Sequence, residues 1–104
     1  PLIITEQPSP TGIFLSAKVI GVMKFLEDRE VDDNLVVVPA DDRHTCNAYN
    51  SLEDLPKLLI NQLQFHFSHY KDLKKAGTTV VESWGDVAEA KEVIKESIQR
   101  WKDL

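Results

Sequence analysis

The sequence predicts an α+β fold in which a small, mainly antiparallel sheet is packed with two helices. Strand-type patterns joined by an acidic turn occupy much of the first 40 residues, and helix-type and strand-type patterns alternate after residue 56. The order of strand, strand, helix, strand, helix is typical of an α+β domain with a small sheet. A chain of 104 residues is long enough for one hydrophobic core and too short for two, so residues 1–104 are expected to form a single domain.

The first half of the chain has the pattern of a β-hairpin. Residues 6–12, EQPSPTG, contain two prolines and a glycine and predict a loop. Apolar and polar side chains then alternate from residue 13 to 19, as in a half-buried strand. Gly21 interrupts this alternation, which indicates a bulge or a bend, and residues 22–26 resume it. A polar turn over residues 27–34 then leads into a second strand, LVVVP, over residues 35–39.

The second half begins with residues 40–50, which lack any period and are expected to form a loop. Pro56 favours the start of a helix, because its missing N–H costs nothing in the first turn. Apolar side chains recur at near-helical spacing from there to about residue 73, and Ala76 with Gly77 predicts the end of this helix.

Residues 78–84, TTVVESW, are rich in β-formers and predict a third strand. Asp86 and Glu89 have the spacing of a capping box at the start of a second helix. This helix carries one apolar stripe that must pack against another element, formed by Val87, Ala90, Ile94, Ile98 and Trp101.

Charge and composition exclude several classes of function. Twelve basic and seventeen acidic residues give a net charge of −5, which repels phosphate backbones and makes nucleic acid an unexpected partner. The apolar runs are too short to span a bilayer, so no membrane association is expected. Cys46 is the only cysteine, which fits a reducing compartment, and the chain starts without a signal-type segment. We therefore expect a cytoplasmic protein.

The segment FLEDREVDDN, residues 25–34, is the most unusual stretch because it holds five carboxylates in ten positions. One interpretation is a solvated hairpin turn whose charges keep a sheet edge soluble. The other is the edge of a metal site, since carboxylate oxygens are the ligands that hard cations prefer. Composition alone leaves both interpretations open.

Three stretches, taken in order, resemble one family: residues 20–39, IGVMKFLEDREVDDNLVVVP; SLEDLP with HFSHYKDL, at 51–56 and 66–73; and residues 80–101, VVESWGDVAEAKEVIKESIQRW. Together they resemble the C-terminal portion of the soluble family I inorganic pyrophosphatases. The resemblance implies that the sheet is part of an OB-like β-barrel flanked by helices. It also implies magnesium-dependent hydrolysis of diphosphate to two phosphates, in which Mg²⁺ ions neutralise the substrate and activate a water.

The resemblance also assigns site residues. Asp32 falls on a metal-ligand aspartate of the family, and Asp28 and Glu27 fall on further acidic positions of the same turn. Tyr70 and Lys71 fall on a Tyr–Lys pair that contacts phosphate.

Three departures from the family pattern are present. Glu27 stands where the family has Asp, and one more methylene displaces a carboxylate by roughly 1.5 Å. Asn34 replaces a phosphate-contacting Lys, and the D-G-D-P-x-D metal signature occurs nowhere in residues 1–104; by the resemblance it would end just before Pro1. We therefore assign no catalytic residue and expect weak magnesium binding, or none, and only weak binding of diphosphate or phosphate.

His66 and His69 share one helical face, but no third ligand is placed nearby, so zinc is not expected. By the resemblance, His69 and Asp72 are predicted to lie at a subunit interface, and a homo-oligomer, a dimer or larger, is expected. Two functions remain. The first is a pyrophosphatase-like domain that does not hydrolyse diphosphate alone and acts through oligomerisation or partner contact. The alternative is a magnesium-dependent inorganic diphosphatase, in which this chain is part of a longer or complemented enzyme.

Overall fold

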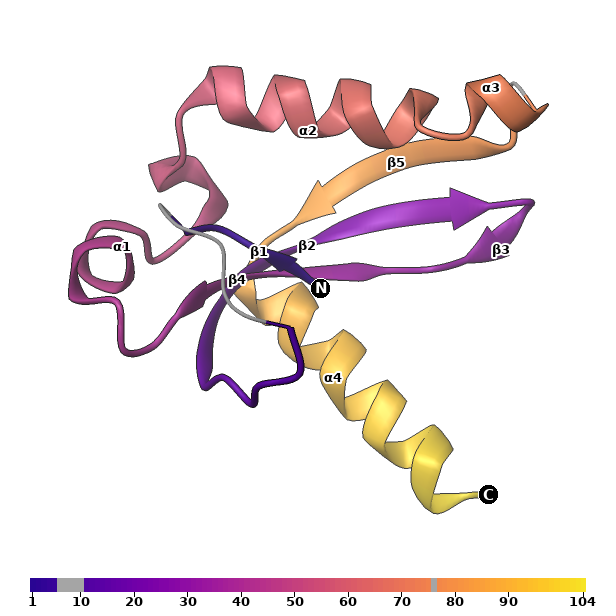
Figure 1. Ribbon diagram of the computed structural model, residues 1–104. Helices are drawn as coiled ribbons and strands as arrows, with labels where there is room; N and C mark the ends of the chain where they lie inside the picture. The colour runs from indigo at the N-terminus through magenta and orange to yellow at the C-terminus, as the bar shows by residue number, and fades with distance from the viewer. Residues whose placement is uncertain (6–10, 76) are drawn as a thin grey trace.

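The computed structural model describes residues 1–5, 11–75 and 77–104 (Figure 1). Their strands and helices, in chain order, are β1 (Leu2–Ile3), β2 (Ala17–Glu27), β3 (Glu30–Val31), β4 (Asn34–Pro39), α1 (Arg43–Ala48), the short 3-10 helix η1 (Leu52–Asp54), α2 (Lys57–His69), α3 (Asp72–Lys75), β5 (Thr79–Gly85) and α4 (Val87–Lys102). This is the predicted α+β class.

The sheet is built around β2, the longest strand. β4 and β5 pair with β2 antiparallel, β3 pairs with its last two residues, and β1 extends the sheet by pairing with β4 in parallel. The sheet is therefore mainly antiparallel, as predicted, with one parallel pair. The pairing of β2 with β4 shifts register between Val19 and Gly21, which confirms the predicted irregularity at Gly21.

Gly21 is required at this irregularity by close packing. A Cβ atom at this position would lie 2.5 Å from Leu52 Cγ and 2.9 Å from the carbonyl oxygen of Gly85. Real Cβ contacts are longer, so only glycine lets η1 and β5 approach the strand this closely.

The hairpin between β2 and β4 ends in a two-residue turn. Glu27 pairs with Glu30 across the turn, and the two residues between them, Asp28 and Arg29, both have positive φ angles, of 52° and 68°. Positive φ at both central positions is the geometry that matches the twist of a two-stranded ribbon. The acidic segment is thus the tip of an extended ribbon, as the hairpin interpretation predicted.

The core lies on both faces of β2 and on β4. Its fully buried side chains come from Ile20, Val22, Met23, Phe25, Val36 and Val38. One cluster joins Ile20 and the two valines of β4 to Leu55, and half-buried residues of η1 and α2 pack against it. Because β2 is the central strand, apolar residues are needed at nearly every position along it.

The two longer helices take up different positions relative to the sheet. α2 runs along β5, and α4 leaves the end of β5 and extends away to the C-terminus (Figure 1). Asp86 caps α4, because its carboxylate accepts a hydrogen bond from the backbone N of Glu89 at 2.9 Å. The predicted apolar stripe of α4 changes along its length: Ala90 is buried against the sheet, whereas Trp101 is 75% exposed.

Several sequence predictions need correction. Residues 43–48, predicted as loop, form α1, which is held by Asp42 at its N-terminus. Residues 13–16 were predicted as strand but precede β2, which starts at Ala17. The helix predicted to run to about residue 73 stops at His69 and resumes at Asp72.

Two predictions concern residues outside the described part of the chain. The predicted loop over residues 6–12 is described only at residues 11 and 12, and the predicted helix end at Ala76–Gly77 only at Gly77, which has a φ of 77°. Within the described ranges, the chain contains no helix that is long and apolar enough to cross a membrane.

Candidate functional site

The tip of the β2–β3 ribbon forms a surface hollow of about 350 Å³. It is lined by Glu27, Asp28, Glu30, Val31 and Asp32. Backbone hydrogen bonds fix its shape: Asp28 N donates to Thr78 O at 2.8 Å, and Asp32 N donates to Phe25 O at 2.9 Å. All three predicted metal-ligand positions therefore lie in one hollow, and Glu30 joins them.

Tyr70 and Lys71 lie at the break between α2 and α3. Tyr70 is anchored by aromatic packing, with its ring centroid 6.3 Å from that of Phe25 and 5.9 Å from that of Phe67. Lys71 Nζ lies 5.8 Å from the centroid of the Tyr70 ring. Next to them, Thr79 Oγ1 donates to Ser68 O at 3.1 Å and ties β5 to the end of α2. The helix break thus places the Tyr–Lys pair beside the ribbon tip.

Lys71 and Glu27 are in direct contact. The Lys71 ammonium donates to Glu27 Oε1, although the two residues are 44 positions apart in the chain. The structure therefore joins a predicted substrate-contacting residue to a predicted metal-ligand position. Asp28 and Asp32 are exposed on the same tip.

Two further polar residues of this region have structural roles. Asn34, which stands at the position of a family Lys, donates from Nδ2 to the carbonyl oxygen of Asp32 at 3.1 Å and supports the turn. Asp33 accepts a hydrogen bond from Lys24 Nζ at 3.3 Å, which links β2 to the residue that precedes β4. These contacts could not be predicted from the sequence, and neither could the position of Glu30 opposite Glu27, which follows from the two-residue turn.

These carboxylates are hard oxygen donors, the type that Mg²⁺ prefers, but they do not assemble a complete cation site. Among the residues that the structure describes, no three or more His, Cys, Asp or Glu side chains converge closely enough to hold a metal ion. A magnesium ion needs several converging oxygens in near-octahedral geometry. The described residues alone therefore do not fit the metal that the resemblance implies.

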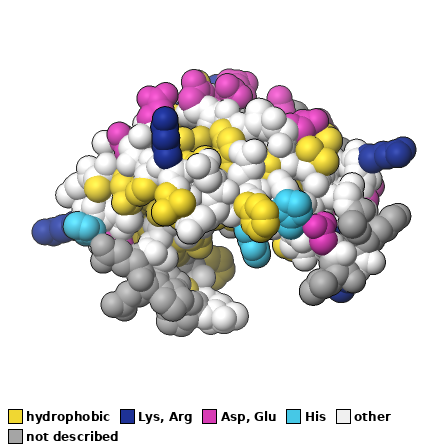
Figure 2. Space-filling model, turned by 90° about the horizontal axis from the view of Figure 1, so that it is seen from above, with side chains coloured by type: hydrophobic (Ala, Val, Ile, Leu, Met, Phe, Trp, Pro, Cys, Tyr) yellow, Lys and Arg dark blue, Asp and Glu magenta, His cyan; other side chains and the backbone are white. Residues whose placement is uncertain are grey.

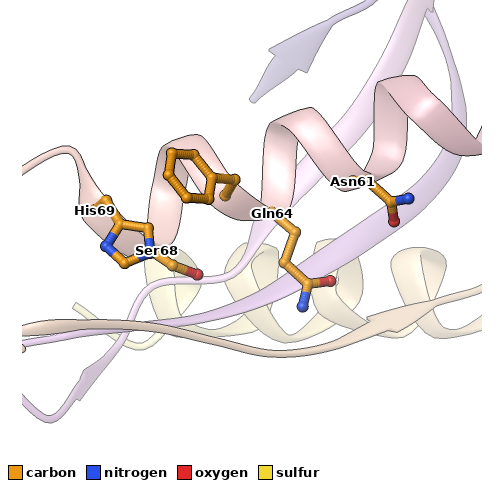
Figure 3. A pocket seen from close by; sticks show the side chains of 5 residues that line it. Asn61, Gln64, Ser68 and His69 are labelled. Atoms are coloured by element: carbon orange, nitrogen blue, oxygen red, sulfur yellow. The ribbon is translucent and has the colours of Figure 1, made fainter.

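The outward face of α2 carries a second hollow, of about 270 Å³, lined by Asn61, Gln64, Phe65, Ser68 and His69 (Figure 3). Seen from above, this side of the molecule shows hydrophobic patches next to histidine side chains, with acidic side chains gathered along one edge (Figure 2).

His69 occupies the end of this face. Its ring packs against that of Phe65 with centroids 4.5 Å apart and planes tilted by 43°, and its Nδ1 lies 2.8 Å from Asp72 Oδ2. His66 turns instead toward Tyr70, with ring centroids 6.1 Å apart. Both histidines therefore contact aromatic rings, and His69 also contacts a carboxylate. The assignment of His69 and Asp72 to a subunit interface stays a prediction.

Comparison with known proteins decides the family. The family model described as inorganic pyrophosphatase matches residues 1–102. The chain belongs to the inorganic pyrophosphatase family. The inorganic pyrophosphatase of Neisseria meningitidis serogroup B is 70% identical over 100 residues, which are 96% of this chain and 56% of that protein. That of Haemophilus influenzae is 68% identical over 102 residues, which are 98% of this chain and 58% of that protein.

Solved structures give the same result for the pyrophosphatase fold. The crystal structure of an inorganic pyrophosphatase from Neisseria gonorrhoeae matches with a TM-score of 0.93 and 68% identity, over 97% of this chain and 58% of that one. An inorganic pyrophosphatase from Thermus thermophilus matches with a TM-score of 0.88 at 25% identity, over 98% of this chain and 61% of that one. The chain spans somewhat more than half the length of the curated relatives it matches.

Proposed function

We propose that this pyrophosphatase-family chain is part of a magnesium-dependent inorganic diphosphatase, which converts diphosphate to two phosphates. We further propose that it corresponds to the C-terminal portion of the family fold and that the rest of the catalytic site lies outside residues 1–104. The observation that carries the proposal is the contact between Lys71 and Glu27, because it unites the acidic ribbon tip with the Tyr–Lys pair in one place.

Each group has a distinct role in this proposal. Lys71 supplies a full positive charge, and Tyr70 a hydroxyl at the end of an anchored ring, both suited to the oxygens of a phosphate group. Asp28 and Asp32 supply exposed carboxylate oxygens at the ribbon tip, as part of a magnesium ligand set that other residues complete. Together they would place opposite charges side by side, as binding of a metal–diphosphate complex requires.

The identity to curated inorganic pyrophosphatases supports the diphosphatase over a purely non-catalytic interaction domain. Residues 1–104 alone are expected not to catalyse the reaction, because the described carboxylates do not assemble a metal site by themselves. The two expectations are compatible, since one concerns the whole protein and the other this segment.

The test is phosphate release from magnesium diphosphate, measured for the protein encoded by the whole reading frame. Replacing one metal-ligand carboxylate, as in Asp32→Asn, is expected to lower the rate by about tenfold or more. Lys71→Met is expected to lower it comparably, because a charge-assisted contact to phosphate is lost. The matched control is Asp103→Asn, an acidic residue at the far end of α4, which should leave the rate unchanged.

An isolated segment of residues 1–104 should release no phosphate above the level of its Asp32→Asn variant. Full activity of both site variants would contradict the proposed function, and activity of the isolated segment would contradict the proposal that the site is completed elsewhere.

We also propose that the protein assembles into a homo-oligomer through the outward face of α2. The support is the exposure of Leu58 and Phe65, which are 68% and 69% accessible on the same helix as His69. Exposed apolar side chains on one face favour contact with another chain.

A further inference from the structure

The contact between Glu27 and Lys71 supports a further inference, which rests on the proposed function and deepens it. The Lys71 and Glu27 side chains are 31% and 29% accessible, so most of each is shielded from water. Shielding strengthens the attraction between opposite charges relative to a fully exposed pair. A ligand that binds either partner must therefore compete with this contact.

Both partners are held by well-defined backbone. Glu27 is the last residue of β2 and pairs with Thr79 of β5 as well as with Glu30. On the other side, the carbonyl oxygen of Lys71 accepts a hydrogen bond from Lys74 N at 2.9 Å, at the start of α3. The ion pair thus bridges two anchored segments.

The pair uses the charges that the proposed reaction would need. The Lys71 ammonium has three N–H donors and Glu27 accepts from one of them, so an incoming phosphate competes with the carboxylate for the same positive charge. The same tip carries Asp28, Glu30 and Asp32, whose negative charges oppose an approaching anion. Lys71 is therefore neutralised by Glu27, on a ribbon tip whose other charged side chains in the hollow are negative.

We propose that Glu27 is the counter-ion of Lys71, a positioning residue that masks the ammonium from anions, and that it is not a metal ligand. This differs from the role that the sequence resemblance assigns to Glu27. It rests on the contact itself: Glu27 has a cationic partner within the chain, whereas Asp28 and Asp32 are exposed on the tip.

The experiment measures two dissociation constants for the protein encoded by the whole reading frame, one for inorganic phosphate without added metal and one for Mg²⁺ alone, by titration calorimetry. Glu27→Gln keeps the shape of the side chain and removes its charge. We expect it to tighten phosphate binding by about threefold to fivefold, the range that a partly exposed ion pair supplies. The Mg²⁺ constant should stay within about twofold of that of the unmodified protein, because loss of a group that orients a metal costs about tenfold or more.

The matched control is Asp33→Asn. It removes one negative charge from the same ribbon, but from a pair with Lys24 at 3.3 Å rather than from Lys71. It should leave phosphate affinity unchanged, which separates the specific contact from a general change in charge. In a Lys71→Met background, Glu27→Gln should no longer affect phosphate binding.

Four results would overturn the inference. Weaker Mg²⁺ binding by tenfold or more in Glu27→Gln, with phosphate binding unchanged, would make Glu27 a metal ligand. An equal gain in phosphate affinity in Asp33→Asn would make the effect one of net charge. If Lys71→Met weakens phosphate binding while Glu27→Gln leaves it unchanged, only the masking role fails. If Lys71→Met has no effect on phosphate binding, the anion role in the proposed function fails as well.

Discussion

At the scale of single residues, Arg29 has a backbone conformation that few L-residues adopt. Its φ of 68° lies in the left-handed region, where the Cβ atom crowds the following carbonyl oxygen at a cost of roughly 1–2 kcal/mol. Asp28, the other residue of the turn, tolerates this region better because its short polar side chain can bond locally. The strain at the ribbon tip is thus concentrated on Arg29.

Arg29→Gly is therefore expected to stabilise the protein by about 1 kcal/mol, since glycine adopts positive φ without the Cβ contact. For a domain of this size the gain corresponds to a rise in melting temperature of about 4–8 °C, measurable by calorimetry. Arg29→Ala is the matched control, because it removes the same side chain but retains Cβ, and it should give no gain. Equal effects of the two substitutions would show that the side chain, and not the backbone, is responsible.

Asp42 and Asp54 make stability depend on pH in the acid range. The side-chain hydrogen bond from Thr45 lowers the pKa of Asp42 below its ordinary value of 3.8, and the backbone N–H groups of Asn50 and Ser51 lower the pKa of Asp54. A group whose pKa is lower in the folded state stabilises the fold above its unfolded value and loses this contribution as pH falls through the folded value. The stabilisation is therefore complete above about pH 4 and lost progressively below it.

We expect the free energy of unfolding to decrease below pH 4 in the unmodified protein, and to decrease less steeply in the Asp42→Asn and Asp54→Asn variants. Urea titrations between pH 2.5 and 5 measure this slope. Asp41→Asn, next to the first position, is a suitable control because no hydrogen bond of its side chain enters the α1 cap. Identical slopes in all four proteins would exclude the two capping carboxylates as the source.

The candidate site could be predicted only in part at this scale. The resemblance placed Tyr70, Lys71 and the acidic positions in the chain, and the structure brings Lys71 and Glu27 into contact. That contact spans 44 residues, and no local spacing encodes it. The role of Asn34, whose amide supports the turn, likewise depends on a backbone conformation that the sequence alone does not specify.

At the scale of elements, the segments with long, regular patterns were predicted well. α2, β5, α4 and the hairpin follow periodic apolar side chains and clear terminal residues such as Asp86. α1 was missed because its six residues are too few to show a period, and its only signal was Asp42 three positions before Thr45. β1 was missed for a similar reason, since its two residues are defined by pairing with β4 and not by a local pattern.

The irregularity in β2 gives a prediction at this scale. Gly21→Ala is expected to destabilise the protein by about 2 kcal/mol, because the new Cβ would press against Leu52 and the backbone of Gly85. Chemical denaturation measures the loss. In a Leu52→Ala background part of the cost should disappear, since one of the two contacts is removed. A full and unchanged cost in that background would place the strain in the backbone of β2 itself.

At the scale of the whole molecule, the outward face of α2 determines the expected assembly. Phe65→Asp is expected to convert the proposed homo-oligomer into single chains, because it places a charge within an exposed apolar patch. Light scattering gives the mass directly. Trp101→Asp is the matched control: Trp101 is also a highly exposed aromatic residue, but it lies at the end of α4. If only Trp101→Asp dissociates the oligomer, the interface lies on α4 and the proposed interface on α2 is wrong.

The different environments of the two tryptophans, Trp84 in β5 and Trp101 in α4, also make the molecule convenient for optical spectroscopy. Trp84 is half-buried and donates its indole N–H to Gln64 Oε1 at 3.1 Å, whereas Trp101 lies in solvent. The two indoles are the only ones in the sequence, so the intrinsic emission has two components of different colour. The emission of Trp84, at shorter wavelength, reports whether β5 and α2 remain packed together. The emission of Trp101, at longer wavelength, reports the environment of the last turn of α4. A single fluorescence spectrum thus separates loss of the packing between β5 and α2 from a change at the end of α4.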